Sequence, residues 1–462
     1  MITFYKKLNL VVWTMLLACG TSSGKNLPNI VFYIADDMGQ MDASIYGSGD
    51  IKTPTMEKLA AMGMTFDNAF VASPSCAPSR AALLSGLMPA RNGAEPNHSY
   101  PNPEIQMLTK PLQDIGYEVV AFGKVAHYRG ASKVGFDYFS DNQVNLAARV
   151  TEYMTQRKSK KPLCLLVGDR RPHVPWISES QYDPGSLKLP DYLIDTKETR
   201  EHWARYCSDI TGLDNEMGQI LELVKSKFKD NFIFLFSSDH GGQWPFGKWN
   251  LYDTGIKTPL VVAWPEKVSA NTRSKAMVSW VDIFPTLIEM VDAEVPSDID
   301  GKSFYHVLKN PASPHRNLIF TTHSGDGKWN VYPIRSVRSN KYKYILNLLP
   351  QAYHTNHSDI LRKDGAGAYW HSWDEKATGN PEAKELISKY YIRPAEEFYD
   401  LEKDPFEQVN LVNNPGLTEK VQKMRAALEE WMKQQGDARR VFNTPYYLYE
   451  DRPTKLSVTG EE

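Results

Sequence analysis

The stretch Ser73-Pro74-Ser75-Cys76-Ala77-Pro78-Ser79-Arg80-Ala81-Ala82-Leu83-Leu84-Ser85-Gly86, residues 73–86, carries the strongest chemical signal in the chain. Cys76 is flanked by proline and small residues, Arg80 follows four positions later, and a helix-like run of alanine and leucine comes next. A helix that begins near Cys76 would favour an anion at its N-terminus. The pattern therefore predicts a nucleophile placed for a negatively charged substrate. The alternative interpretation is a buried cysteine in a loop that happens to contain Pro and Arg.

Length and charge set broad limits on the function. The chain has 462 residues, and this length suggests about two or three domains, or one large α/β domain with an appendage. Its 53 basic and 55 acidic residues give a net charge of −2. No overall field therefore draws in nucleic acid, which we do not expect as a partner, and any affinity for an anion must be local.

The N-terminus has the pattern of a targeting segment. Lys6 and Lys7 precede an apolar run that is too short to span a bilayer, and Leu16-Leu17-Ala18-Cys19 resembles a bacterial lipobox. We expect residues 1–18 to be a lipoprotein signal peptide and Cys19 to be lipidated, which would anchor the protein to a membrane. A plain secretory signal is the alternative. Either way we expect an exported protein, periplasmic or at the cell surface of a Gram-negative bacterium.

The body of the chain predicts an α/β fold. Short apolar runs rich in β-branched and aromatic residues alternate with helical patterns, which favours a mostly parallel sheet flanked by helices. The predicted strands are residues 30–35, 118–122, 162–167, 232–236 and 259–264. We assign this catalytic domain to residues 26–316.

The pattern changes after Arg316. Predicted strands at 332–338, 342–348 and 397–401 are followed by a helix with Val421, Met424, Leu428 and Trp431 on one face. We expect residues 317–450 to form a smaller α+β domain with a four-stranded antiparallel sheet.

Polar residues follow four of the predicted strands of the first domain. They are Asp36 and Asp37, then Lys124 and His127, then His173, and last Asp239 and His240. Ligands bind beyond the carboxyl ends of strands in open α/β sheets, so these segments should converge on one crevice.

Two of these segments together predict a divalent cation site. The adjacent carboxylates of Asp36 and Asp37 repel each other unless a cation lies between them, and Asp239 with His240 offers two further ligands. Oxygen ligands favour Ca²⁺ or Mg²⁺ over Zn²⁺. Taken alone, Asp-Asp is equally consistent with a solvated turn or a helix cap.

Several basic residues are candidates for binding the substrate. Lys124 and Lys248 suit the oxygens of a sulfate, and the planar fork of Arg80 suits the oxygens of the nucleophile. The candidates for proton transfer are His127 and His173. Candidates for the wall of a substrate pocket are His98 and His323.

The chain resembles the type I, formylglycine-dependent sulfatases of the alkaline-phosphatase-like fold, from Asn29 to the C-terminal helix. Cys76-Ala77-Pro78-Ser79-Arg80 matches their signature, in which the cysteine is oxidised to formylglycine (3-oxoalanine). Within that family the chain is similar to the N-sulfoglucosamine sulfohydrolases (sulfamidases) and their bacterial relatives, on the segments 247–252, 332–337 and 398–405. Two departures are His240, where sulfamidases commonly have Asn, and one extra residue in Gly123–His127, a spacing similar to that of iduronate sulfatases.

The resemblance implies a role for each matching residue. Ca²⁺ would be held by Asp36, Asp37, Asp239 and His240, with position 76 also touching the metal. Arg80 and His127 would attend the formylglycine hydrate, Lys124 and Lys248 the sulfate, and His173 the leaving group. It also implies a formylglycine-generating or sulfatase-maturating enzyme as a partner.

These observations predict a sulfatase that acts on a sulfated polysaccharide or its oligosaccharides. The substrate would be a glycosaminoglycan such as heparan, carrying N- or O-sulfate, or an algal glycan such as ulvan, with O-sulfate slightly favoured. One alternative is a phosphoester or phosphonate hydrolase of the same superfamily. The other is a lipoprotein that binds sulfated glycans without catalysis, as would hold if Cys76 remained a thiol.

Overall fold

The computed structural model describes residues 26–265 and 267–460, with the side chains of Tyr128 and Arg129 left out. The predicted signal peptide, residues 1–18, and the lipidation site Cys19 lie outside the described residues. Of the helices that are described, none is both long enough and apolar enough for a membrane crossing.

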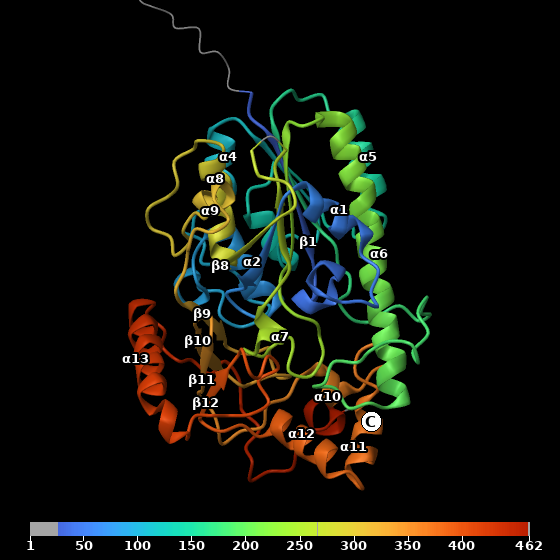
Figure 1. Cartoon of the computed structure of the whole chain (residues 1–462), viewed down its shortest axis with the longest axis vertical. Helices are drawn as coiled ribbons and strands as arrows, with labels where there is room; N and C mark the ends of the chain where they lie inside the picture. The colour runs from blue at the N-terminus through green and yellow to red at the C-terminus, as the bar shows by residue number, and fades with distance from the viewer. Residues whose placement is uncertain (1–25, 266, 461–462) are drawn as a thin grey trace, which may run out of the picture.

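A large mixed sheet forms the centre of the molecule (Figure 1). Its strands, within the described residues, are β1 (Asn29–Ala35), β2 (Met64–Phe70), β3 (Glu118–Gly123), β4 (Tyr138–Ser140), β5 (Leu163–Gly168), β6 (Phe232–Ser238), β7 (Leu260–Ala263) and β8 (Thr272–Ser279). They are ordered β4-β3-β5-β1-β6-β7-β2-β8. The five strands from β4 to β6 in that order run parallel, which confirms the predicted architecture.

Three strands of this sheet were missed from the sequence, and β7 runs against the expected direction. β7 is antiparallel to both of its neighbours, β6 and β2. The missed strands β2, β4 and β8 lie towards the two ends of the strand order. β8 begins with the polar residues Thr272-Arg273-Ser274-Lys275, and β4 has three residues that are all at least partly exposed. The edge strands β4 and β8 do not need the continuous apolar run by which the buried strands were recognised. In β2, which pairs with β8, the half-buried polar residues Asp67 and Asn68 interrupt that run.

Helices cover both faces of the large sheet. Figure 1 shows α1, α5 and α6 on one side and α2, α4 and α8 on the other. The helices of this part are α1 (Pro54–Met62), α2 (Cys76–Ser85), α3 (Pro89–Asn92), α4 (Thr109–Asp114), α5 (Leu146–Gln156), α6 (Lys197–Phe228), α7 (Asp253–Ile256), α8 (Ile283–Met290) and α9 (Tyr305–Lys309). The apolar face of α6, which includes Ile210, Leu213 and Met217, is buried against the sheet layer.

A second sheet is formed by the C-terminal part of the chain. Its strands are β9 (Ile319–His323), β10 (Ile334–Arg338), β11 (Tyr342–Asn347) and β12 (Glu396–Asp400), in the order β12-β11-β10-β9 and all antiparallel. The helices here are α10 (His357–Leu361), α11 (Trp370–Ala377), α12 (Pro381–Tyr391), α13 (Thr418–Gln434) and α14 (Lys455–Thr459). This confirms the predicted four-stranded antiparallel sheet, whose fourth strand, β9, had not been located. The boundary at residue 317 remains a prediction.

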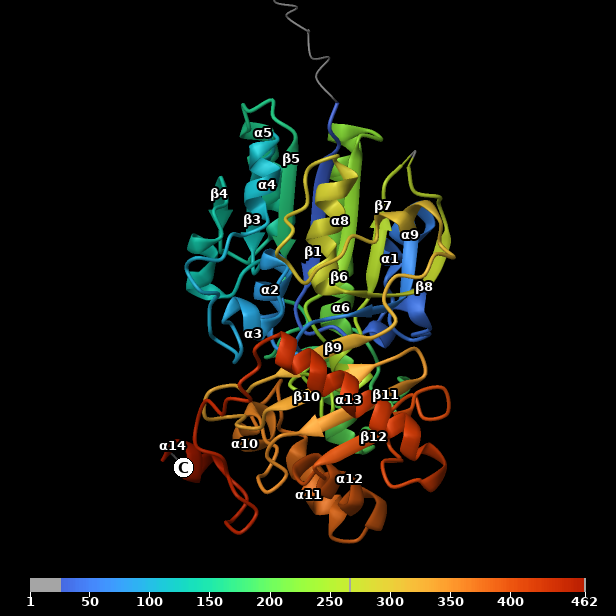
Figure 2. The same ribbon diagram turned by 90° about the vertical axis from the view of Figure 1, so that its left-hand side faces the viewer.

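Helix α13 packs on the second sheet, as Figure 2 shows. Val421, Met424 and Leu428 are buried there as predicted. Trp431 is half-buried and stacks on Phe320 with ring centroids 4.7 Å apart, while Met432 completes the buried face.

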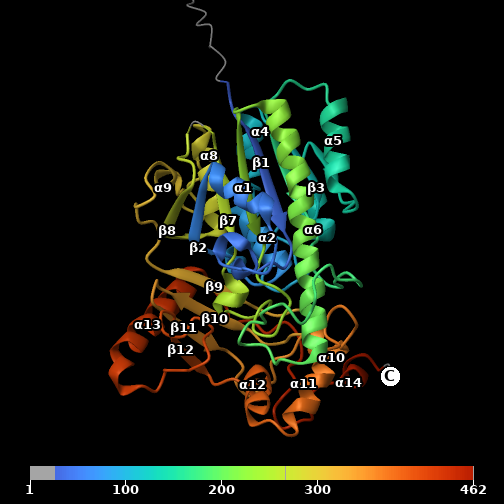
Figure 3. The same ribbon diagram turned by 45° about the vertical axis from the view of Figure 1, so that its right-hand side comes forward.

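The smaller sheet lies below the end of the large sheet at which β1 finishes (Figures 2 and 3). The polar residues that follow the parallel strands therefore face the C-terminal part of the chain. A site at this edge is therefore lined by residues from both the large-sheet part and the C-terminal part of the chain.

Candidate active site

The polar residues that follow the parallel strands lie at one edge of the sheet. Strands β3, β5, β1 and β6 are adjacent in that order. Three of them are followed directly by predicted site residues, and His173 comes five residues after the end of β5. Asp36-Asp37 follows β1, Lys124 follows β3, and Asp239-His240 follows β6. The structure thus brings together segments that lie up to about two hundred residues apart, because parallel strands end at a common edge.

Cys76 is the first residue of helix α2, as the sequence predicts. Ser75 precedes the helix in an extended conformation, and the whole helix is buried. The hydroxyl of Ser79 donates to the carbonyl oxygen of Asp239 at 2.6 Å, which ties the first turn of α2 to the end of β6. The amide groups at this N-terminus favour a negatively charged group beside Cys76.

Five buried residues surround one point at this edge. The ligand atoms of Asp36, Asp37, Cys76, Asp239 and His240 all lie within 4.8 Å of one another. Nε2 of His240 is 3.3 Å from Sγ of Cys76 and 3.4 Å from Oδ1 of Asp37. Carboxylate oxygens with one imidazole are ligands suited to a hard divalent cation, so the donor set fits the predicted metal. The protein therefore carries a candidate metal-binding cluster.

Three cationic side chains balance the three carboxylates of this cluster. Nζ of Lys124 is 2.5 Å from Oδ2 of Asp36, and Nζ of Lys248 is 2.8 Å from Oδ2 of Asp37. Arg80 donates to Oδ2 of Asp239 at 2.9 Å and to Oδ1 of Asp36 at 3.3 Å. Burial by itself would raise the carboxyl pKa values. Lys124 nevertheless holds the pKa of Asp36 well below its usual range, and Lys248 lowers that of Asp37.

The unmodified thiol of Cys76 is a poor nucleophile in this setting. Burial and the neighbouring carboxylate of Asp36 raise the pKa of Cys76 well above its ordinary value. Only the thiolate is strongly nucleophilic, so the protonated thiol would not attack a substrate at neutral pH.

Close backbone packing fixes the position of Lys124. Gly123 has φ +69°, and a Cβ there would lie 2.2 Å from the carbonyl oxygen of Gly168. The amide of Lys124 donates to the same oxygen at 2.8 Å. Glycine is required at 123, since any side chain would push β3 and β5 apart at the point where Lys124 enters the site.

The cluster opens into a cavity of about 400 Å³ between the two parts of the chain. Cys76, Lys248, His98, His127 and His173 line it, as the sequence predicts for a shared site. The predicted residue His323 does not line it. That side chain is buried in β9, where Nε2 lies 2.9 Å from Oδ1 of Asn330.

The cavity histidines have shifted pKa values. Burial, together with Lys124, lowers the pKa of His127 to about 2. Burial and the positive charge of Lys248 lower the pKa of His173 to about 3. Both imidazoles are therefore neutral at neutral pH while the cavity holds no anion.

Several cavity residues were not identified from the sequence. They are Asn97, Val174, Pro175, Gln243, Asp326, His357, Leu361, Lys363, Asp364 and Ala366. Six of them, from Asp326 to Ala366, come from the C-terminal part of the chain. Nothing in the local sequence around Asp326 indicated that this residue lines the same cavity as Cys76. Trp249, an aromatic residue of a type that suits many sugars, also lines the cavity.

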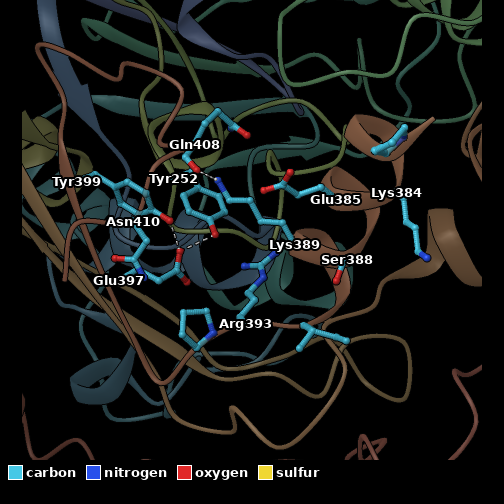
Figure 4. Close-up of a pocket in the computed structure, with 13 residues that line it drawn as sticks. Tyr252, Lys384, Glu385, Ser388, Lys389, Arg393, Glu397, Tyr399, Gln408 and Asn410 are labelled. Carbon is cyan, nitrogen blue, oxygen red and sulfur yellow. Dashed lines mark hydrogen bonds between the residues drawn. The ribbon is translucent and has the colours of Figure 1, made fainter. Parts of the chain in front are cut away.

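A second cavity, of about 550 Å³, lies between α12, β12 and Tyr252 (Figure 4). Two of its charged groups, Lys389 and Glu397, are already bonded within the protein. Lys389 donates to the carbonyl oxygens of Glu407 and Gln408, and Glu397 accepts from Tyr252. We therefore place the candidate active site in the smaller cavity, where the titratable groups converge.

Comparisons with known proteins agree with this arrangement. Residues 28–293 match the family model described as Sulfatase, and residues 240–357 match the model described as N-sulphoglucosamine sulphohydrolase, C-terminal. The chain belongs to the sulfatase family. The sequence-based assignment of family and fold is thus confirmed, and the protein is a sulfuric ester hydrolase by its relatives.

Two curated relatives and one solved structure illustrate the likeness of this sulfatase to known proteins. An ulvan-active sulfatase of Formosa agariphila is 29% identical, covering 89% of this chain and 81% of that protein. The human N-sulphoglucosamine sulphohydrolase is 25% identical, covering 87% and 89%. A solved structure in complex with its substrate, D-glucosamine-2-N,6-O-disulfate, aligns with a TM-score of 0.66 at 20% identity, covering 90% of this chain and all of that one. At that identity the structural likeness shows the fold alone.

Proposed function

We propose that this sulfatase hydrolyses sulfate groups on a sulfated polysaccharide or its oligosaccharides and releases inorganic sulfate, with a formylglycine formed from Cys76. The observation that carries the proposal is the position of Cys76. It begins a buried helix, lies beside the candidate metal cluster and lines the cavity. A buried thiol with a raised pKa has no evident use there, whereas an oxidised side chain does.

The donor set of the cluster supports calcium as the resident ion, held by Asp36, Asp37, Asp239 and His240 with position 76 alongside. When present, calcium would supply a Lewis acid for a sulfate oxygen, and the formylglycine hydrate would supply the attacking hydroxyl group. The remaining chemistry belongs to the side chains that surround these two groups.

Lys124 and Lys248 would bind the non-bridging oxygens of the sulfate. Each ammonium group is almost fully buried, and each is held near the cluster by a carboxylate. A fixed positive charge in a site from which water is excluded stabilises the charge that develops on the sulfate oxygens. Arg80 would orient the oxygens at position 76, because its guanidinium group is anchored by Asp239 and Asp36.

His173 would donate a proton to the leaving oxygen or nitrogen of the sugar. Its pKa of about 3 describes the cavity without an anion, where burial and the charge of Lys248 disfavour protonation. A bound sulfate offsets the charge of Lys248, so the pKa of His173 would rise as the substrate binds. His127 would take the hydroxyl proton whose removal lets the sulfate leave.

The names of the relatives support a sulfated glycan as the substrate class. They include proteins named for ulvan and for N-sulphoglucosamine. We keep both O-sulfate and N-sulfate open, with O-sulfate favoured. Assays of sulfate release from defined ulvan and heparan oligosaccharides separate them, since the two types differ in whether oxygen or nitrogen leaves.

Two further proposals concern the modification and the export of the protein. Oxidation of Cys76 requires a formylglycine-generating or sulfatase-maturating enzyme as a partner. The Leu16–Cys19 motif supports export, removal of residues 1–18 and a lipid anchor on Cys19 in a Gram-negative envelope. Mass spectrometry of protein from its native host tests both modifications.

Mass spectrometry of the peptide that contains residue 76 is the decisive test of the proposed chemistry. Conversion of the thiol to an aldehyde, together with sulfate release from an aryl sulfate, supports catalysis. An intact thiol in active protein contradicts the proposal, and an intact thiol in inactive protein that binds glycans favours the non-catalytic alternative. Faster release of phosphate than of sulfate from matched aryl esters would favour a phosphoester hydrolase.

A further inference from the structure

Lys363 places a positive charge at the mouth of the active-site cavity. It belongs to the loop of residues 362–369 between α10 and α11, it lines the cavity, and it is exposed. Among the described residues, no carboxylate pairs with its ammonium group, and the neighbouring Asp364 pairs with Arg205 instead. An ammonium group in this position is available to a ligand that enters the cavity.

The loop that carries Lys363 is held against the segment that carries His173. The carbonyl oxygen of Lys363 accepts the backbone N–H groups of residues 366–368, which makes the loop compact. The backbone N–H of Trp176 donates to the carbonyl oxygen of Gly365 at 2.8 Å. Gly365 has φ +67°, and a Cβ there would lie 3.0 Å from the carbonyl oxygen of Trp176. Backbone contacts therefore fix where residue 363 stands relative to His173.

Arg205 of α6 strengthens this junction. Its guanidinium group donates to Oδ1 and Oδ2 of Asp364 at 2.7 Å and 3.1 Å. It also donates to the carbonyl oxygens of Ile177 and Trp176, at 2.5 Å and 3.2 Å. Figures 1 and 3 show the beginning of α6 beside α10 and α11. Because Arg205 balances the charge of Asp364, the charge of Lys363 is the one left without a partner on this loop.

Lys248 and Lys363 lie at different depths of the same cavity. Lys248 is 2% exposed and contacts the metal cluster through Asp37, whereas Lys363 is exposed at the mouth. The two charges act on the same wall residue. Burial lowers the pKa of His357 to about 4, and both ammonium groups contribute to that lowering. Positive charges at two depths suit a ligand that carries two anionic groups.

We propose that Lys363 is a specificity-determining residue that binds a second anionic group of the substrate, a carboxylate or a sulfate, in addition to the sulfate that is removed. This rests on the function proposed above, in which Lys124 and Lys248 bind the sulfate to be cleaved and the sugar extends towards the mouth. A glycan with a uronate or a further sulfate beside the cleaved group is then preferred over one without. Both groups accept hydrogen bonds from an ammonium group, so experiment has to separate them.

Two kinds of substrate test this role. 4-Nitrophenyl sulfate carries only the sulfate that is cleaved, whereas an ulvan or heparan oligosaccharide carries uronate and further sulfate groups. We expect Lys363→Ala to lower kcat/KM for the oligosaccharide by about 5-fold, the upper end of what an exposed ion pair contributes, and to leave kcat/KM for the aryl sulfate unchanged. Lys363→Arg should keep most of the activity, Lys363→Glu should lose more, and high salt should reduce the difference between Lys363→Ala and the wild type.

The matched control is Lys423→Ala, the same change at an exposed lysine of α13 that does not line the cavity. It should change kcat/KM for neither substrate. Equal values of kcat/KM for the oligosaccharide in Lys363→Ala and the wild type overturn the proposal, and so does an equal loss on the aryl sulfate.

Modified oligosaccharides identify the anionic group. If reduction of the uronate to an alcohol removes the difference between Lys363→Ala and the wild type, the carboxylate is the partner of Lys363. If selective removal of the second sulfate removes that difference, the sulfate is the partner. A difference that persists when both groups are absent contradicts the proposal.

A binding measurement separates this proposal from the proposed function. Cys76→Ala cannot form the aldehyde and should bind the oligosaccharide without cleaving it. Isothermal titration calorimetry should show binding about 5-fold weaker when Lys363→Ala is added to Cys76→Ala, and unchanged binding when Lys423→Ala is added. An equal Kd with and without Lys363→Ala, or no binding to either protein, contradicts the role of Lys363. Weaker binding together with a wild type that releases no sulfate instead rejects the proposed function and keeps Lys363 as a glycan contact.

Discussion

Nζ of Lys124 lies 3.3 Å from Sγ of Cys76. The same ammonium nitrogen is 2.5 Å from Oδ2 of Asp36, so it joins the predicted nucleophile position to the metal cluster. Gly123 and the end of β3 fix the backbone on which Lys124 stands. Because this positive charge is already in place before the reaction, it stabilises the transition state more than the same charge in solvent would.

Cys76→Ala should abolish sulfate release, because alanine cannot become an aldehyde. Lys124→Ala should lower kcat by about 10²- to 10³-fold, the loss that follows removal of one preorganised donor to developing charge. Colorimetric assay of sulfate measures both. Circular dichroism should show both variants folded, and near-normal turnover in either would remove that residue from the mechanism.

Occupation of the metal cluster should stabilise the protein. Three buried carboxylates lie within one group of ligands, and a bound cation would relieve their repulsion. A ligand present at 100 times its Kd adds about 2.7 kcal/mol, so the melting temperature should rise with calcium and fall with a chelator. Asp239→Asn should reduce this rise, whereas Asp282→Asn, outside the cluster, should keep it. A melting temperature that does not respond to calcium argues against a cation site.

The strand ends explain why much of the site could be predicted from the sequence. β1, β3, β5 and β6 are fully or almost fully buried, so each has the apolar composition by which it was recognised. The residue after each strand is then placed by topology alone. The sequence alone therefore predicts that the Asp36-Asp37 and Asp239-His240 segments lie at the same edge of the sheet.

The identity of the residues that line the cavity depends on long-range packing, which cannot be predicted from the local sequence. Asp326 contacts Asn97, which is 229 positions away. His323, three residues before Asp326, was the expected substrate contact, but it lies within β9 opposite Ile334 and is buried there. Neither β9 nor the turn after it was located from the sequence, so nothing there indicated which of these two residues faces the cavity.

Acid should destabilise the protein in part through Asp282. Burial alone would raise the pKa of this carboxyl, but Arg316 and His315 hold it at about 2. Because the unfolded value is higher, the unfolded state binds the proton more readily below about pH 4. The stabilisation is therefore complete above that pH and is lost as the pH falls towards 2. The shift corresponds to about 2 kcal/mol.

Urea unfolding of the wild type and Asp282→Asn between pH 3 and pH 7 isolates this contribution. The difference in unfolding free energy between the two proteins should be largest at pH 7 and should shrink as the pH falls. A difference that stays constant across the range would contradict the assignment to this ion pair.

The role of His173 as an acid predicts a dependence on the leaving group. A sugar hydroxyl is a poor leaving group and needs a proton, whereas 4-nitrophenolate leaves as an anion. His173→Ala should therefore lower kcat for a glycan sulfate by about 10²- to 10⁴-fold, the range that proton transfer contributes, and lower kcat for 4-nitrophenyl sulfate far less. Lys248→Ala is the matched control, since it removes a charge from the sulfate in both substrates and should slow both alike. Equal losses on the two substrates in His173→Ala would mean that this imidazole binds the sulfate and does not protonate the leaving group.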